Sequence, residues 1–124
     1  MIINTNKAPK AVGPYSQAVL SQGVVYTSGQ LPIDPSTGKF VPGGIEEQTR
    51  QSLTNLMEVL NEAGSSNEKV LKTTVFLSDM NNFSKMNKVY EEFFKPGNFP
   101  ARSAIQVAAL PMGALVEIEA IAVV

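Results

Sequence analysis

The chain has 124 residues, a net charge of −1 and 44% hydrophobic residues, which suits one globular domain over residues 1–124 with a modest core. Cysteine and histidine are absent, which excludes disulfides, thiolate nucleophiles, Cys- or His-based metal sites and a Ser-His-Asp triad. The near-neutral charge and scattered lysines provide no basic groove for nucleic acid. Catalysis would have to use carboxylates, Tyr, Lys, Arg, hydroxyls, backbone groups or water.

The N-terminal third of the chain predicts short strands separated by turns. Residues 1–14 show little periodicity and are expected to form an irregular or edge-strand entry. Strands are predicted for Gln17–Leu20 and Val24–Gln30, joined as a hairpin. Asp34–Gly38 is a turn-rich loop, and Phe40-Val41 is one more short extended piece.

The middle of the chain predicts a long helix that begins near Glu46. Its apolar residues recur at helical spacing and form a buried stripe, and Gly64 ends the helix. The stripe consists of Leu53, Leu56, Met57 and Leu60.

The C-terminal half predicts a strand at Val70–Ser78, a second helix capped by Asn81 or Asn82, and strands at Arg102–Ala109 and Leu115–Val123. The predicted order is β-β-α-β-α-β-β. This order favours an α+β fold, in which a mixed β-sheet carries two helices on one face.

The last strand is predicted to have two unlike faces, because side chains alternate along a strand. One face is wholly apolar and should lie under the helices. The other face mixes Glu117 and Glu119 with aliphatic residues, so it is neither a core nor an ordinary wet surface. Oligomerisation is the simplest cover for that face, and a ligand pocket would then form at the subunit boundary.

Arg102 is the strongest candidate for chemistry in the chain. It is one of only two arginines and opens an apolar strand, where a partly shielded guanidinium needs an anionic partner. That partner is either internal, from Glu117 or Glu119, or a ligand carboxylate or phosphate held by paired hydrogen bonds. Arg102 and Glu117 would meet if the face shared by Arg102, Ala104 and Gln106 is the Glu117 side. We favour a small carboxylate ligand.

Five segments of the chain, in one order and at one spacing, resemble the Rid/YjgF family of reactive-intermediate (imine) deaminases. They are Gly13-Pro14-Tyr15-Ser16-Gln17, Thr27-Ser28-Gly29-Gln30, Asp79–Phe83 with Asn87 and Tyr90, Pro100-Ala101-Arg102-Ser103, and Val116–Ala120. The resemblance covers essentially the whole chain.

The resemblance implies a chorismate-mutase-like fold and a homotrimer with a central barrel and three sites between subunits. It also implies hydrolysis of reactive 2-imino and 2-enamino acids, of the 2-aminoacrylate and 2-iminobutanoate type, to 2-keto acids and ammonia. The implied ligand is a small 2-imino or 2-keto acid, and no cofactor or metal is expected. The implied role is metabolite damage control.

The resemblance assigns roles to two groups of residues. By position, Arg102 would bind the substrate carboxylate and Glu117 would place the attacking water. The pocket residues would be Tyr15, Ser28, Gly29, Asn87 and Ala104, the last at a position where many relatives have Cys. The contacts expected at Ala104 are main-chain contacts, so its side chain should not affect hydrolysis.

Three other readings remain open from the sequence. The first is a non-catalytic or regulatory trimer that binds a small carboxylate in the same cleft. The second is an endoribonuclease, which the missing basic patch disfavours. The third is a chorismate mutase proper, whose dianionic substrate calls for more than one cation. No apolar run approaches the ~18 residues of a membrane span and no signal peptide is recognised, so a cytoplasmic protein is expected.

Overall fold

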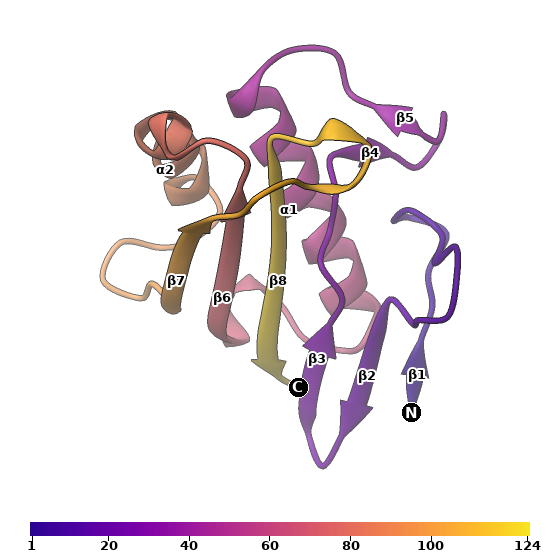
Figure 1. The fold of residues 1–124 in the computed structure, drawn as a ribbon. Helices are drawn as coiled ribbons and strands as arrows, with labels where there is room; N and C mark the ends of the chain where they lie inside the picture. Colours follow the sequence, from indigo (N-terminus) through magenta and orange to yellow (C-terminus); the bar gives the residue numbers. More distant parts are fainter.

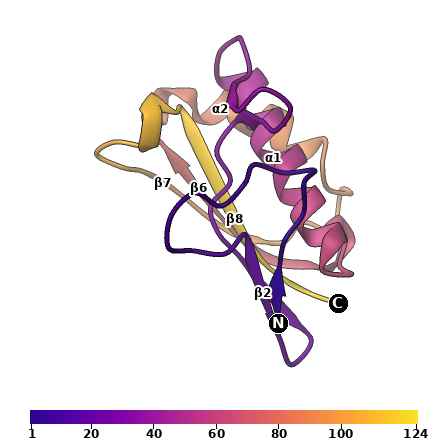
Figure 2. The same cartoon turned by 90° about the vertical axis from the view of Figure 1, so that its right-hand side faces the viewer.

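A six-stranded sheet with two helices on one of its faces forms the framework of the computed structural model, which describes residues 1–124 (Figures 1 and 2). The helices are α1 (Ile45–Glu62) and α2 (Phe83–Glu91). In spatial order, the strands are β1 (Ile2–Ile3), β2 (Ala18–Ser21), β3 (Val24–Thr27), β8 (Val116–Val123), β6 (Val70–Leu77) and β7 (Ala101–Gln106). The predicted mixed α+β architecture is confirmed.

All neighbouring strands of this sheet are antiparallel except β6 and β7. Parallel neighbours need a crossover connection, and α2 lies within the segment that joins β6 to β7. Two short strands, β4 (Ile33–Asp34) and β5 (Lys39–Phe40), form a separate hairpin. Neither helix has the length and apolar character that crossing a membrane requires.

The core lies between the helices and one face of the sheet (Figure 2). Leu53, Leu56 and Leu60 of α1 are fully buried there, as their helical spacing predicts. Along β8 every second residue is buried, which confirms the predicted apolar face. Helix α1 stops where expected, because Gly64 adopts a φ of +86° that a residue with a side chain rarely takes.

Some strand ends and one cap differ from the prediction. Strand β3 stops at Thr27, and Gln30 makes only an isolated bridge to Ile118. Strand β7 stops at Gln106 because its partner β6 ends at Leu77. Neither Asn81 nor Asn82 caps α2 with its side chain; Asp79 instead accepts a bond from the Asn81 N–H in the short turn before the helix.

The sheet face opposite the helices is uncovered in the single chain and carries an apolar row beside its carboxylates. Strand register places Ile2, Val19, Tyr26 and Ile121 in one row across four strands of this face. Ile2 is 68% exposed and Tyr26 is 51% exposed. An apolar surface of this extent indicates an interaction with another molecule.

Helix α1 also buries polar residues beside its leucine stripe. Gln48, Thr49, Ser52 and Asn55 are all buried. The amides of Gln48 and Asn55 form hydrogen bonds, whereas the hydroxyls of Thr49 and Ser52 have no partner. A buried hydroxyl without a hydrogen bond lowers stability, because it loses its contacts with water and gains nothing in return.

Two fully buried threonines provide a matched test of this point. Thr49→Val should leave the free energy of unfolding unchanged or raise it, because it replaces an unpaired hydroxyl. Thr73→Val should lower it by about 1–3 kcal/mol, because the Thr73 hydroxyl pairs with the Tyr90 hydroxyl at 2.7 Å. Urea denaturation of both variants measures the difference, and equal losses would contradict the assignment.

Candidate active site

Arg102 lies on β7, on the face of the sheet that the helices cover. Its register partner on β6 is Thr73, which is fully buried beneath α2. The Arg102 guanidinium carbon lies 4.8 Å from the centre of the Tyr90 ring and 5.4 Å from that of Phe83. Arg102 Nη1 also donates a hydrogen bond of 2.6 Å to Asn87 Oδ1. Two aromatic rings and a neutral amide therefore hold the cation.

Arg102 has no carboxylate partner within the chain. The two ion pairs present are Arg50–Glu92 and Lys95–Glu68, both at the surface. The reading of Arg102 as a structural partner of Glu117 or Glu119 is therefore wrong. A guanidinium carries five N–H donors, and a side-chain acceptor engages only one of its nitrogens here, so donors remain for an anion.

A hollow of about 330 Å³ lies beside the Arg102 guanidinium. Its lining residues are Asn87, Tyr90, Glu91, Phe99, Pro100 and Arg102. The Tyr90 hydroxyl at this site is bonded to Thr73, and burial raises the pKa of Tyr90, so Tyr90 stays neutral beside the cation. The lining is therefore mostly polar, with the Glu91 carboxylate and the Asn87 amide beside the guanidinium. Because Arg102 forms no ion pair, its free N–H donors can bind a small organic anion in this hollow.

Glu117 lies on the opposite face of the sheet from Arg102. On β6, Glu117 is paired with Phe76, whereas Thr73, three residues away, is paired with Arg102. An odd separation along a strand places the two side chains on different faces. The face that carries Arg102 is therefore not the Glu117 side, and the two residues do not meet within one chain.

The Glu117 carboxylate borders a separate cavity of about 780 Å³. Tyr15, Ser28, Gly29 and Met112 line this cavity together with Glu117, and Glu119 and Lys10 supply further charges. Burial raises the pKa of Glu117, and the neighbouring Glu119 carboxylate raises it further. Glu117 is therefore a stronger base than an exposed glutamate.

Gly29 packs directly against the Glu117 carboxylate. A Cβ at position 29 would lie 2.5 Å from Glu117 Oε1, so a side chain there would displace the carboxylate. The neighbouring Ser28 donates its hydroxyl proton to the Ser16 carbonyl at 2.6 Å, which uses that donor within the chain. Tyr15 is half exposed, and its hydroxyl accepts a long bond from the Val12 N–H.

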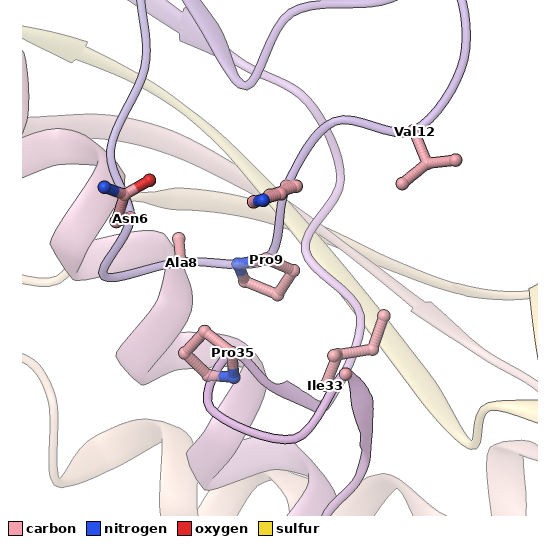
Figure 3. Close-up of a pocket in the computed structure, with 8 residues that line it drawn as sticks. Asn6, Ala8, Pro9, Val12, Ile33 and Pro35 are labelled. Carbon is pink, nitrogen blue, oxygen red and sulfur yellow. The ribbon is translucent and has the colours of Figure 1, made fainter.

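A further cavity of about 510 Å³ lies between the N-terminal segment and the β4–β5 hairpin (Figure 3). Asn6, Ala8 and Pro9 line one side, and Ile33 and Pro35 line the other (Figure 3). Lys10 is the only charged residue in its lining. Because it shares Lys10, Val12, Ile33 and Gly38 with the Glu117 cavity, it extends that cavity and is not a second reaction centre.

The seven residues singled out from the sequence fall into two groups. Arg102 and Asn87 lie together on the helix-covered side, where Ala104 is paired with Val75 two positions further along β7. The second group, on the other side, consists of Tyr15, Ser28, Gly29 and Glu117. The first group holds the guanidinium and the second holds the half-buried Glu117 carboxylate, on opposite faces of the sheet, and we call the two groups half-sites.

Sequence reasoning missed three residues of these half-sites. Phe83 and Tyr90 belong to the apolar stripe of α2, so their spacing indicates core rather than contact with Arg102. Met112 has a left-handed backbone with a φ of +58°, which is unusual for a residue other than glycine. The segment Pro111-Met112-Gly113 predicts a turn, but it indicates neither the left-handed backbone of Met112 nor its place beside Glu117. Such strain is often found at functional sites.

A family model described as "Endoribonuclease L-PSP" matches residues 5–124. The chain belongs to this family. It is 57% identical over 122 residues to the bovine (Bos taurus) "2-iminobutanoate/2-iminopropanoate deaminase", covering 98% of this chain and 88% of the relative. These findings confirm the Rid family predicted from the sequence, and an enzyme that acts on a carbon–nitrogen bond.

Solved structures of Rid proteins share the whole fold. The Rid family protein YyfA from Yersinia pestis is 52% identical, with a TM-score of 0.96, and the match covers 100% of this chain and 98% of that one. The structure of Escherichia coli TdcF with bound serine is 44% identical, with a TM-score of 0.94 and the same coverage. That protein binds a small amino acid.

The raised pKa of Glu117 can be tested by direct titration. Glu119→Gln should lower the pKa of Glu117 because it removes a neighbouring negative charge. The pKa should stay above the ordinary glutamate value, since burial is the larger cause. Carbon-13 NMR titration of the carboxyl groups measures both effects. The control is Glu62→Gln, at an exposed position at the end of α1. An unchanged pKa in Glu119→Gln would rule out the coupling.

Proposed function

We propose that this protein hydrolyses reactive 2-imino acids and their 2-enamino tautomers to 2-keto acids and ammonia. The observation that carries the proposal is that the Arg102 guanidinium forms no ion pair and borders a small hollow. The name of the bovine relative, 2-iminobutanoate/2-iminopropanoate deaminase, supports this substrate class. Each such substrate carries one carboxylate, which matches one available cation.

We further propose a chorismate-mutase-like homotrimer in which the uncovered sheet faces form a central barrel. Arg102 and Glu117 lie on opposite faces of one sheet, so a single chain cannot bring both to one small substrate. A neighbouring subunit packed on the apolar open face can supply the missing half. Each site would then combine Arg102 and Asn87 of one subunit with Tyr15, Ser28, Gly29 and Glu117 of the next.

Arg102 would grip the substrate carboxylate through paired N–H donors. The bond to Asn87 and the rings of Phe83 and Tyr90 hold the guanidinium in place before the ligand arrives, so little entropy is lost on binding. The guanidinium also offsets the negative charge of the ligand in a sheltered cleft. This contribution is positioning and electrostatic, and it leaves the bond-breaking chemistry to water.

Glu117 would orient a water molecule and accept its proton as the water oxygen bonds to the imine carbon. The carbon–nitrogen double bond becomes a single bond, and the resulting carbinolamine carries a hydroxyl and an amino group. Glu117 returns the proton to the amino group, and the carbon–nitrogen bond breaks with its electron pair leaving on ammonia. The hydroxyl gives its proton to the Glu117 carboxylate and becomes the ketone oxygen, and Glu117 then loses that proton to the departing ammonia. The raised pKa of Glu117 suits a group that both takes and returns a proton.

The second candidate is a trimer that binds a small carboxylate without turnover. The TdcF structure with bound serine favours it, because that relative holds a small amino acid. The half-buried Glu117 carboxylate, whose pKa is raised, favours turnover, since a binding module needs no such group. The ribonuclease description of the family finds no counterpart in a basic surface here, because the net charge is −1.

Arg102→Ala should reduce ammonia release from imines generated in situ by at least about 100-fold, because the substrate loses its anchor. Arg102→Lys should also be poor, since a point charge does not reproduce the planar fork. Arg50→Ala, at the chain's other arginine, is the matched control and should retain full activity, because Arg50 forms only an exposed pair with Glu92. Wild-type rates in Arg102→Ala would reject the assignment.

Mixing two inactive variants tests whether subunits share the site. Arg102→Ala and Glu117→Gln should each be inactive alone. Unfolded together and refolded, they should regain part of the activity, because some sites then pair an intact Arg102 with an intact Glu117 from another subunit. Refolding each variant separately and then mixing is the control. Absence of recovery in trimers shown to be mixed would place both residues in one subunit.

A further inference from the structure

Helix α1 sends two buried amide side chains to the backbone segments that surround the Glu117 cavity. Asn55 is fully buried, and its Nδ2 donates to the Leu31 carbonyl at 3.0 Å and to the Ile33 carbonyl at 2.8 Å. Leu31 and Ile33 both line the Glu117 cavity. Asn55 therefore lies behind the wall of this cavity without touching its interior.

The geometry fixes the orientation of the Asn55 amide. Two backbone carbonyls can only accept hydrogen bonds, so the NH₂ group of Asn55 must face them. Its Oδ1 accepts a 2.8 Å bond from Gln51 Nε2, one turn earlier on α1. All three bonds agree with a single arrangement of the amide, which makes it a rigid brace.

The segment that Asn55 holds is also anchored at both of its ends. The Ser28 N–H donates to the Gln17 carbonyl at 2.9 Å, and the Val41 N–H donates to the Pro32 carbonyl at 3.1 Å. Residues 28–32 lie between β3 and β4, outside regular strands. Gln30 bridges Ile118 of β8 through two backbone bonds of 2.8 and 3.2 Å. Pro32 has no N–H to donate. Asn55 thus fixes this segment from the helix side, while β8 fixes it from the sheet side.

Gln48, on the same helix, holds the residue that precedes β8, the strand that carries Glu117. Its Oε1 accepts a 2.9 Å bond from the N–H of Leu115, two residues before Glu117. Gln48 and Asn55 are seven residues apart, which is two helical turns, so both project from one side of α1. Helix α1 therefore holds two backbone segments: the one that packs against the Glu117 carboxylate and the one that leads into its strand.

We propose that Asn55, with Gln48 as its partner, is a positioning residue for Glu117, because it holds the Gly29–Ile33 segment against the carboxylate. Gly29 leaves no space beside Glu117 Oε1, so a small outward shift of this segment would admit water. The other titratable groups that line the cavity are Lys10, Tyr15 and Glu119. Asn55 forms no hydrogen bond with any of them, so a change in the pKa of Glu117 in Asn55→Ala would report on the segment.

The test compares Asn55→Ala with Ser52→Ala, a fully buried residue on the same helix whose hydroxyl has no partner. In Asn55→Ala, the pKa of Glu117 should fall toward the ordinary value, and amide exchange should accelerate at the unbraced segment. Ser52→Ala should leave both unchanged. Carbon-13 and amide NMR measure these effects without any substrate.

The kinetic effect rests on the proposed function. The kcat for imine hydrolysis should fall about 10- to 100-fold in Asn55→Ala, because the water is misplaced. KM should change little, since Arg102 binds the carboxylate on the other half-site. The acidic limb of the pH–rate profile should move to lower pH, because the less buried Glu117 stays ionised there.

The outcomes separate the two proposals. A wild-type protein without imine hydrolysis would overturn the proposed function but leave the NMR test standing. A folded Asn55→Ala with wild-type Glu117 pKa and wild-type amide exchange would overturn the positioning role. If Asn55→Ala does not fold, Gln51→Ala decides, because it removes only the bond that orients the amide and should give the same changes at smaller size.

Discussion

The Arg102 guanidinium is the interaction on which the site depends, because its charge is held without being neutralised. Ring faces and an amide oxygen attract a cation but carry no formal charge. A carboxylate in the same place would have neutralised the charge of Arg102, which would then attract a ligand anion only weakly. The aromatic residues of α2 therefore serve both the core and the site, since Tyr90 packs under the sheet and supports Arg102.

The alternation of side chains along strands both builds the core and divides the site. On β6, the residues that face the helices pair with Arg102 on one neighbour and with buried β8 residues on the other. The residues that face away pair with Glu117 and Glu119. The same geometry that buries Val116 and Ile118 thus exposes Glu117 on the far face. Under the proposed trimer, a second chain would complete the site by packing on the open face of the sheet.

The sequence was sufficient for the elements and for the faces of β8, because these follow from local periodicity. It was not sufficient for the side of the sheet on which Arg102 lies, since the register of β7 against β6 is a long-range property. The hydrogen bonds of Asn55 could not be predicted from the sequence either. Its partners are backbone carbonyls about twenty residues away, and the leucine stripe beside it is the stronger signal on α1.

Several features around Glu117 cost stability, and their concentration at one place supports a functional reading. The folded-state pKa of Glu117 lies above its unfolded value, so its favourable contribution is full at low pH and is lost as pH rises through the folded pKa. Near neutrality, the ionised carboxylate therefore destabilises the fold. Met112 adds backbone strain beside it. Stability alone gives no reason to keep either feature. Under the proposed mechanism, the half-buried carboxylate is kept because it is the base, and Asn55 is proposed to hold the segment beside it.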